Sequence, residues 1–65
     1  MRLEINGADR DVSAVTLAEL IDEVFGTRRG SAAVVDGTVI PRSHWPTLAL
    51  RDGQRIELIT AVQGG

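Results

Sequence analysis

Residues 16–26, with the sequence TLAELIDEVFG, carry the signals of one complete amphipathic helix. Thr16 and Glu19 have the capping-box spacing, in which the hydroxyl and the carboxylate reciprocally satisfy backbone amides at a helix start. Apolar residues then recur at i, i+3, i+4, i+7 and i+8 and form a single stripe: Leu17, Leu20, Ile21, Val24 and Phe25. Gly26 follows as a left-handed C-cap. A helix with one apolar stripe needs a surface to pack on, and the flanking segments predict strands.

The segment before this helix has the pattern of a β-hairpin. Leu3 and Ile5 alternate with polar residues, which is the period of a half-buried strand. Asn6-Gly7 comes next and accepts the positive φ angles of a type I′ turn. We therefore predict that residues 8–12 return antiparallel to the first strand.

A second hairpin is predicted after the helix. Residues 32–35, Ala-Ala-Val-Val, are typical of a short and mostly buried strand, and Asp36-Gly37 provides the turn. The return strand covers residues 38–40 and is expected to end at Pro41, which has no amide donor. Residues 43–46 are then predicted to form an irregular turn.

The last strand is predicted to be the longest. It follows the turn Arg51-Asp52-Gly53, alternates in polarity from residue 55 to residue 62, and runs into Gln63-Gly64-Gly65. Hairpin, helix, hairpin and final strand predict an α+β fold, with one main helix packed on a mixed sheet of four to five strands. We place the folded domain at residues 1–62 and a flexible tail at residues 63–65.

Length and composition limit the kind of function. A chain of 65 residues makes one domain, and a domain of this size hides only roughly 60% of the surface of its unfolded chain. Such a core rarely encloses a ligand pocket, which usually needs about 300 Å³ or more, so we expect function at the surface. Apolar residues make up 43% and charged residues 25%, which is ordinary globular usage and indicates a chain that folds.

The missing residue types exclude several chemistries. Without cysteine there is no disulfide framework, thiolate nucleophile or zinc–cysteine cluster, which fits a reducing compartment. Neither a basic leader with an apolar run nor a membrane-length apolar stretch occurs, so we expect a cytoplasmic protein without a membrane partner. The net charge is −2 and the seven basic residues are scattered arginines, which disfavours nucleic acid as a partner.

The closing pair Gly64-Gly65 is the strongest candidate for chemistry. Because glycine has no side chain, two of them can pass through a narrow channel in a partner and bring a bare carboxylate to a nucleotide. A carboxylate is a poor electrophile, so acyl chemistry there requires an enzyme that uses ATP to form an acyl-adenylate, from which sulfur can displace AMP. The alternative interpretation of the same dipeptide is a frayed end or a remnant of cloning.

The order of elements and the tail together resemble the ubiquitin-like β-grasp sulfur carriers, and within them the ThiS family of thiamine biosynthesis. The resemblance covers essentially the whole chain. Its motifs are a hairpin with Pro-Arg-x-x-Trp, an Asp-Gly turn and a closing diglycine, here Val35-Asp36-Gly37-Thr38-Val39-Ile40-Pro41-Arg42-Ser43-His44-Trp45, Asp52-Gly53-Gln54-Arg55-Ile56 and Gly64-Gly65.

This resemblance implies roles for the tail and for partner proteins. Gly65 becomes an acyl-adenylate and then a thiocarboxylate, while Gly64 and Gln63 supply the flexible approach. The implied partners are an E1-like adenylyltransferase of the ThiF type, a cysteine-desulfurase-derived persulfide as sulfur donor, and a thiazole synthase of the ThiG type. The chain itself is expected to be a monomeric co-substrate without a bound cofactor.

Two alternatives to this function stay open. The small subunit of molybdopterin synthase resembles the chain in fold and tail, although that family is usually longer. A ubiquitin-like interaction module with an incidental diglycine is the alternative from a different class. An enzyme is disfavoured because three serines, one histidine and no cysteine offer no recognisable triad.

Ile59 is the candidate partner contact within the last strand. If Leu58 faces the helix, strand alternation turns Ile59 to the opposite face of the sheet, where a partner can cover it. Together with Ala61 and Val62 it forms the predicted partner interface. The alternative is a contact of Ile59 with a neighbouring strand.

Four further residues are expected to lie outside any functional site. His44 stands alone, which is a poor basis for a metal site or a proton relay, so we expect it in a surface turn. Trp45 can anchor an interface, but with Phe25 as the one other aromatic it is expected to cap the small core. Arg28 and Arg29 are expected in solvent rather than in an acidic groove of a partner.

Overall fold

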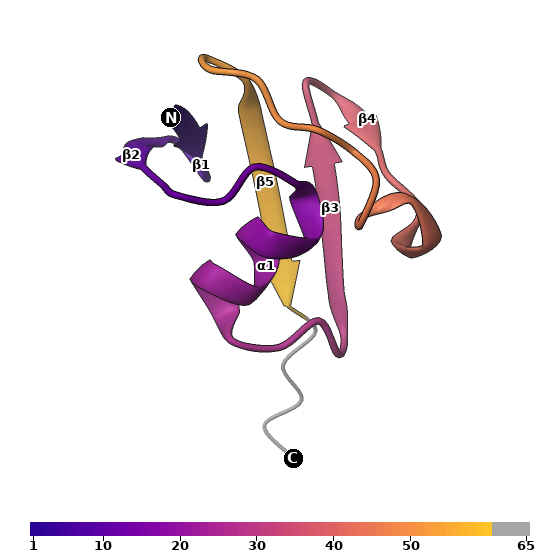
Figure 1. Ribbon diagram of the computed structural model, residues 1–65. Coiled ribbons are helices and arrows are strands. Elements are labelled where there is room, and N and C mark those ends of the chain that lie inside the picture. Colours follow the sequence, from indigo (N-terminus) through magenta and orange to yellow (C-terminus); the bar gives the residue numbers. More distant parts are fainter. Residues whose placement is uncertain (61–65) are drawn as a thin grey trace.

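The computed structural model of the chain describes residues 1–60. In chain order its elements are β1 (Arg2–Ile5), β2 (Ala8–Asp11), α1 (Leu17–Phe25), β3 (Ser31–Val35), β4 (Thr38–Val39), the 3₁₀ helix η1 (Arg42–His44) and β5 (Arg55–Thr60) (Figure 1). The predicted α+β fold is confirmed, and the described part of the sheet has five strands.

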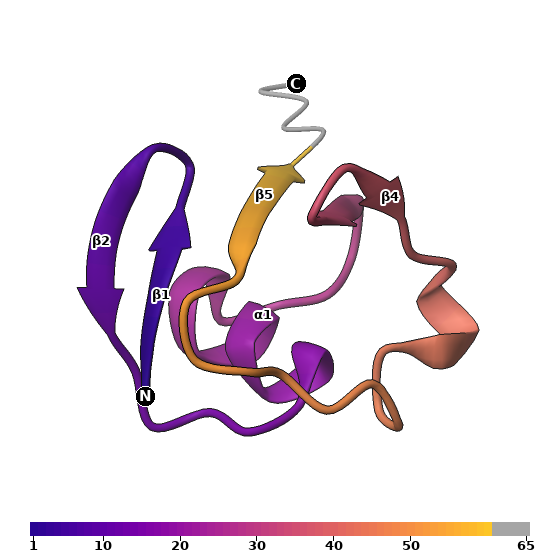
Figure 2. The ribbon, with the colours of Figure 1, turned by 90° about the horizontal axis from the view of Figure 1, so that it is seen from above.

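The last strand lies in the middle of the sheet. The spatial order is β2-β1-β5-β3-β4, so β5 separates the two hairpins. It pairs parallel with β1, where Ile5 lies opposite Ile56, and antiparallel with β3, from Val35 opposite Ile56 to Ser31 opposite Thr60. Figure 2 shows α1 on one side of this mixed sheet. Both hairpins therefore depend on β5 for their position.

The helix begins and ends where the sequence predicts. The Glu19 amide donates to Thr16 Oγ1 over 3.2 Å, and the Thr16 amide donates to Glu19 Oε1 over 3.4 Å, so the capping box is complete. Gly26 has φ 77°, in the left-handed region, and its amide donates to the Asp22 carbonyl over 2.9 Å. The stripe and Ala18 beside it face the sheet, and four of these side chains are buried: Leu17, Ala18, Leu20 and Ile21.

The segment after η1 satisfies backbone amides at the helix start. The Leu17 amide donates to the Leu48 carbonyl and the Ala18 amide to the Trp45 carbonyl, both over 3.0 Å. The first amides of a helix have no acceptor within it, so this segment supplies the missing carbonyl acceptors. The region predicted as an irregular turn starts with one regular 3₁₀ turn, closed by the Trp45 amide on the Arg42 carbonyl over 3.1 Å.

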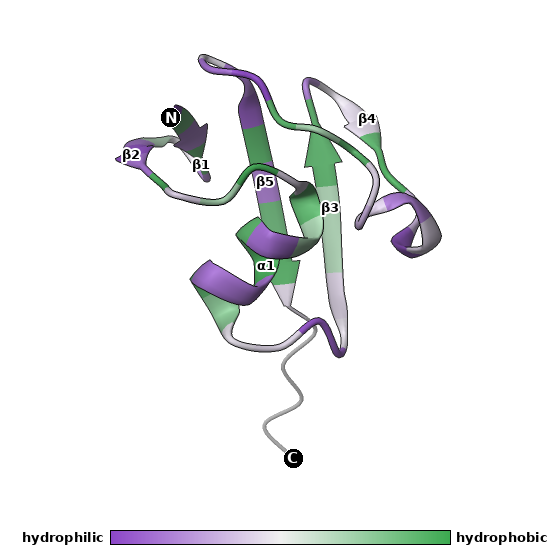
Figure 3. Ribbon diagram, viewed as in Figure 1, coloured by the Kyte–Doolittle hydropathy of each residue, from purple (hydrophilic) through white to green (hydrophobic). Residues whose placement is uncertain are grey.

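The hydrophobic core lies between α1 and one face of the sheet. Trp45 is 1% exposed and its Nε1 donates to the Ile40 carbonyl over 3.0 Å, so the prediction that it caps the core is confirmed. The strand residues that join it from β5 are Ile56 and Leu58, which alternate with polar or exposed positions (Figure 3). The remaining core residues come from both hairpins, α1 and the loops: Leu3, Ile5, Val12, Ala14, Leu17, Ala18, Leu20, Ile21, Ala33, Val35 and Leu50.

One burial prediction was wrong. The strand predicted as mostly buried alternates instead: Ala33 and Val35 are buried against α1, whereas Ala32 is exposed and Val34 is half-buried. The reason is that no described element covers the second face of the sheet, which we call the open face. Figure 2 places α1 entirely on the other side.

Candidate functional site

β5 connects the centre of the sheet with the predicted reactive end of the chain. It ends at Thr60, the last described residue. The predicted tail and two of the three predicted interface residues lie outside the described residues and stay predictions: Ala61, Val62, Gln63, Gly64 and Gly65. Among residues 1–60, the candidate site is therefore the surface around the end of β5.

An apolar patch on the open face runs from the end of β5 across β3 to β4. Ile59 is 55% exposed, which confirms the prediction that it turns away from the helix. Ala32 lies directly opposite Ile59 in the β3–β5 ladder, and Val39 lies opposite Val34 in the β3–β4 ladder. Directly opposed residues share a face, so we define the apolar patch as Ala32, Val34, Val39 and Ile59.

Three members of the apolar patch were missed by the sequence analysis. Val39 is 69% exposed, although the sequence assigns it only to a strand. The available signal was the alternation of β3: once Ala33 and Val35 face the core, Ala32 and Val34 must face away from it. The prediction of a mostly buried strand concealed that signal.

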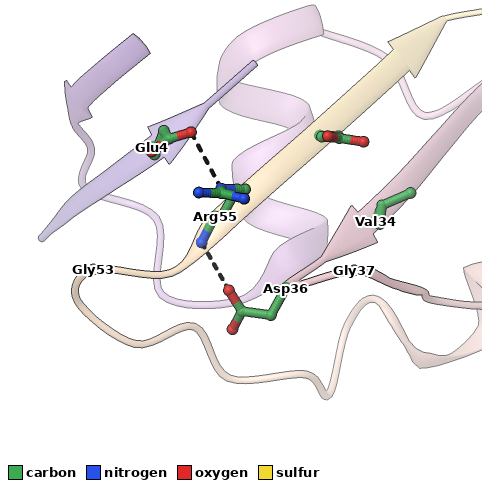
Figure 4. A pocket seen from close by; sticks show the side chains of 7 residues that line it. Glu4, Val34, Asp36, Gly37, Gly53 and Arg55 are labelled. Carbon is green, nitrogen blue, oxygen red and sulfur yellow. Dashed lines mark hydrogen bonds and ion pairs between the residues drawn. The ribbon is translucent and has the colours of Figure 1, made fainter. Parts of the chain in front are cut away.

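A shallow hollow of about 440 Å³ lies further back along β5. Arg55 dominates it: its Nε lies 3.3 Å from Glu4 Oε2, and its backbone amide donates to Asp36 Oδ1 over 3.0 Å (Figure 4). The hollow is open, and the charges of Arg55 and Glu4 within it are paired with each other, whereas Glu57 also lines it. We therefore assign no ligand to it, and the polar groups there act as cross-strand ties.

The remaining candidate residues have structural surroundings. Arg28 donates from Nε and Nη2 to the two carboxylate oxygens of Asp22 over 3.0 and 2.9 Å. This side-chain hydrogen bond lowers the pKa of Asp22 and raises the pKa of Arg28. Arg28, Arg29 and His44 are all exposed as expected, and Arg28 is in addition paired with Asp22.

The described residues offer neither a metal site nor a membrane-crossing helix. Residues 1–60 contain no group of three or more histidine and carboxylate side chains placed to hold a metal ion. The one α-helix in this range, α1, is too short to cross a membrane. The exposed features around β5 are thus an apolar patch and an open polar hollow, which suit contact with another protein.

Comparison with known proteins connects this geometry to a family. A thiazole synthase of Paramagnetospirillum magneticum is 32% identical over 66 residues, which cover all of this chain but only 20% of that protein. The sulfur carrier protein ThiS of Escherichia coli is 28% identical over 50 residues, 77% of this chain and 76% of its own. This chain thus spans about one fifth of the first relative and about three quarters of the second.

The fold comparison and the family profile agree. The crystal structure of the thiamine biosynthesis protein ThiS from Geobacter metallireducens matches with a TM-score of 0.82 and 22% identity, and each chain is covered completely. At that identity the match concerns the fold. The sequence profile of the ThiS family matches residues 3–65, which include the closing diglycine. On this match, which takes in nearly the whole chain, the protein belongs to the ThiS family.

Proposed function

We propose that this chain is a sulfur carrier whose Gly65 carboxylate is converted to a thiocarboxylate and donates sulfur for thiazole formation in thiamine biosynthesis. The observation that carries the proposal is the family match, which continues through Gly64 and Gly65. The names of the two relatives, a thiazole synthase and a sulfur carrier protein, support the thiamine branch over molybdopterin synthesis.

The chemistry divides between the tail and its partners. A carboxylate oxygen of Gly65 attacks the α-phosphorus of ATP, and pyrophosphate leaves. A persulfide sulfur then attacks the acyl carbon and AMP leaves, after which a second thiol cleaves the S–S bond and releases the thiocarboxylate. The chain has no cysteine to supply either thiol, so an E1-like adenylyltransferase and a persulfide donor are required, and a thiazole synthase accepts the sulfur.

The apolar patch is the proposed docking surface for the adenylyltransferase. Five residues follow Thr60, and an extended chain spans at most ~3.3–3.6 Å per residue, so five residues can reach at most about 18 Å beyond the end of β5. An enzyme that takes this carboxylate into its active centre must pack against the surface around that end. Ile59, at 55% exposure on the last strand, is the nearest large apolar side chain of the patch.

The sulfur-carrier proposal is tested by mass. The protein is incubated with ATP, a ThiF-type adenylyltransferase and a persulfide source, and its C-terminal peptide is weighed. The expected product has one oxygen replaced by sulfur. An unchanged mass, under conditions that thiolate the Escherichia coli relative, would refute the proposal.

Two tail variants separate the carrier from an interaction module. Deletion of Gly65 shortens the tail, so that the terminal carboxylate falls one residue short of the partner's active centre. One alanine appended after Gly65 moves the terminal carboxylate one residue too far. Both are expected to abolish growth without thiamine while leaving the thermal unfolding midpoint unchanged. Normal growth of either variant would support an interaction module in which the diglycine is incidental.

A further inference from the structure

The side chain of Asn6 continues the β1–β5 ladder after β1 has ended. The last backbone pair of this ladder is Ile5 opposite Ile56, and the Asn6 amide then donates to the Ile56 carbonyl over 2.9 Å. Beyond it, Asn6 Nδ2 donates to the Leu58 carbonyl over 3.1 Å, and the Leu58 amide donates to Asn6 Oδ1 over 2.9 Å. One carboxamide thus takes the place of a neighbouring peptide group.

The turn geometry explains why a side chain takes this place. Asn6 has φ 52° and Gly7 has φ 85°, so the backbone turns away toward β2 while β5 continues. Asparagine tolerates the left-handed region better than most residues with a Cβ. Its carboxamide also carries both a donor and an acceptor, whereas an ionised aspartate carries acceptors only. The residue therefore meets the demands of the turn and of β5 together.

The end of β5 is held differently on its two sides. On one side the β3 ladder continues to Ser31 opposite Thr60. On the other side β1 has ended, and the contact that residues 1–60 provide at Leu58 is the carboxamide of Asn6. Among residues 1–60, the second side of β5 at Leu58 is thus held by one side chain and not by a backbone ladder.

We propose that Asn6 is a positioning residue that fixes the direction in which β5 delivers the C-terminal segment to the adenylyltransferase. The inference rests on the proposed sulfur-carrier function. Without the carboxamide, the end of β5 samples several directions, and the apparent affinity falls by the fraction that is competent to bind. Once the tail is bound, the reacting carboxylate is the same. The expected signature is thus a higher KM with little change in kcat.

Asp36 provides a matched control at the opposite end of the same strand. It has φ 49° and is followed by Gly37 with φ 85°, so its turn has the same backbone form. Its Oδ1 accepts from the Arg55 amide over 3.0 Å, and its own amide donates to the Arg55 carbonyl over 2.8 Å. Asp36→Gly therefore removes a side-chain tie to β5 far from the C-terminal end.

The experiment compares Asn6→Gly, Asn6→Asp and Asp36→Gly in the full chain. Glycine keeps both turns, and aspartate keeps the shape of Asn6 but loses the Nδ2 donor. Pyrophosphate release by the adenylyltransferase gives KM and kcat, hydrogen exchange reports the Leu58 amide, and urea unfolding reports stability. Both Asn6 variants are expected to raise KM about tenfold at nearly constant kcat, which corresponds to about one tenth of the molecules being competent.

The outcomes separate this inference from the function on which it rests. Faster exchange at Leu58 with a raised KM in the Asn6 variants, and an unchanged KM in Asp36→Gly of similar stability, supports the positioning role. Equal KM values for Asn6→Gly and Asp36→Gly overturn it and leave the sulfur-carrier function intact. If the unaltered chain releases no pyrophosphate with an active adenylyltransferase, the proposed function and the positioning role both fail.

Discussion

Truncation of Ile59 to alanine should weaken binding of the adenylyltransferase without weakening the fold. Ile59 is 55% exposed on the open face, so its outer carbons contribute little to the core. Surface substitutions of this kind usually change the free energy of unfolding by less than about 0.5 kcal/mol. A loss of affinity without a loss of stability is the result that distinguishes a docking residue from a packing residue.

The expected loss of affinity follows from the exposed carbons. Ile59→Ala removes three carbons, each worth about 0.8 kcal/mol when fully buried. Since 55% of the surface of Ile59 is exposed and can be covered by a partner, the expected loss of binding free energy is about 1.3 kcal/mol. At 1.4 kcal/mol per factor of ten, the Kd should rise close to tenfold.

Isothermal titration calorimetry against the adenylyltransferase measures this change, and Val15→Ala is the control. Val15 is also 55% exposed, but it lies in the loop before α1 and outside the apolar patch. Its truncation should leave the Kd within about twofold of the parent value. Equal effects of the two substitutions on Kd would show that the apolar patch is not where this enzyme docks.

Three predictions concern the fold itself. Thr16→Ala removes the hydroxyl that accepts from the Glu19 amide, and should lower the free energy of unfolding by about 1 kcal/mol, measured by urea denaturation; no change would mean that the capping box is redundant. Trp45→Phe leaves the Ile40 carbonyl without its indole donor, and should cost about 1–3 kcal/mol by circular dichroism in urea; a neutral result would show that water replaces the bond. The hydrogen bond from Arg28 lowers the pKa of Asp22 below its ordinary value of 3.8, so this pair stabilises the fold above that pH and loses its effect as the pH falls through the lowered value. Thermal unfolding should therefore show a smaller acid-induced loss in Asp22→Asn than in the parent chain, and identical profiles would contradict this assignment.

Local signals were predictable because they act over a few residues. The capping box and the two hairpin turns each depend on neighbouring backbone groups, and Asn6 and Asp36 adopt the positive φ angles that their turns require. The burial of Trp45 was predictable for a different reason. In a small core with few aromatic residues, one large side chain supplies much of the buried apolar area.

Long-range pairings were not predictable from one sequence. The bonds between Asn6 and Leu58 join residues 52 positions apart, and no local pattern contains that distance. The same holds for the Leu48 and Trp45 carbonyls that accept from the first helical amides. Ala32 was misjudged because a short apolar run does not reveal whether one or both faces of its sheet are covered.

The candidate site was half predictable for the same reason. Alternation along β5 places Ile59 on the open face without any knowledge of its neighbours. The apolar patch as a surface also requires the register that sets Ala32 opposite Ile59 and Val39 opposite Val34. Register is a property of the assembled sheet, so the contact between these residues became visible only in three dimensions.

The one-sided sheet has a consequence for how such a chain can diverge. Residues such as Leu58 that specify the fold point to α1, whereas those that a partner can touch point the other way, so the two sets accept substitutions independently. On the docking role that we propose, exchange of Val39 and Ile59 alters the partner contact while the fold persists. The match to the Geobacter metallireducens protein, at 22% identity and a TM-score of 0.82, shows that this fold tolerates extensive substitution.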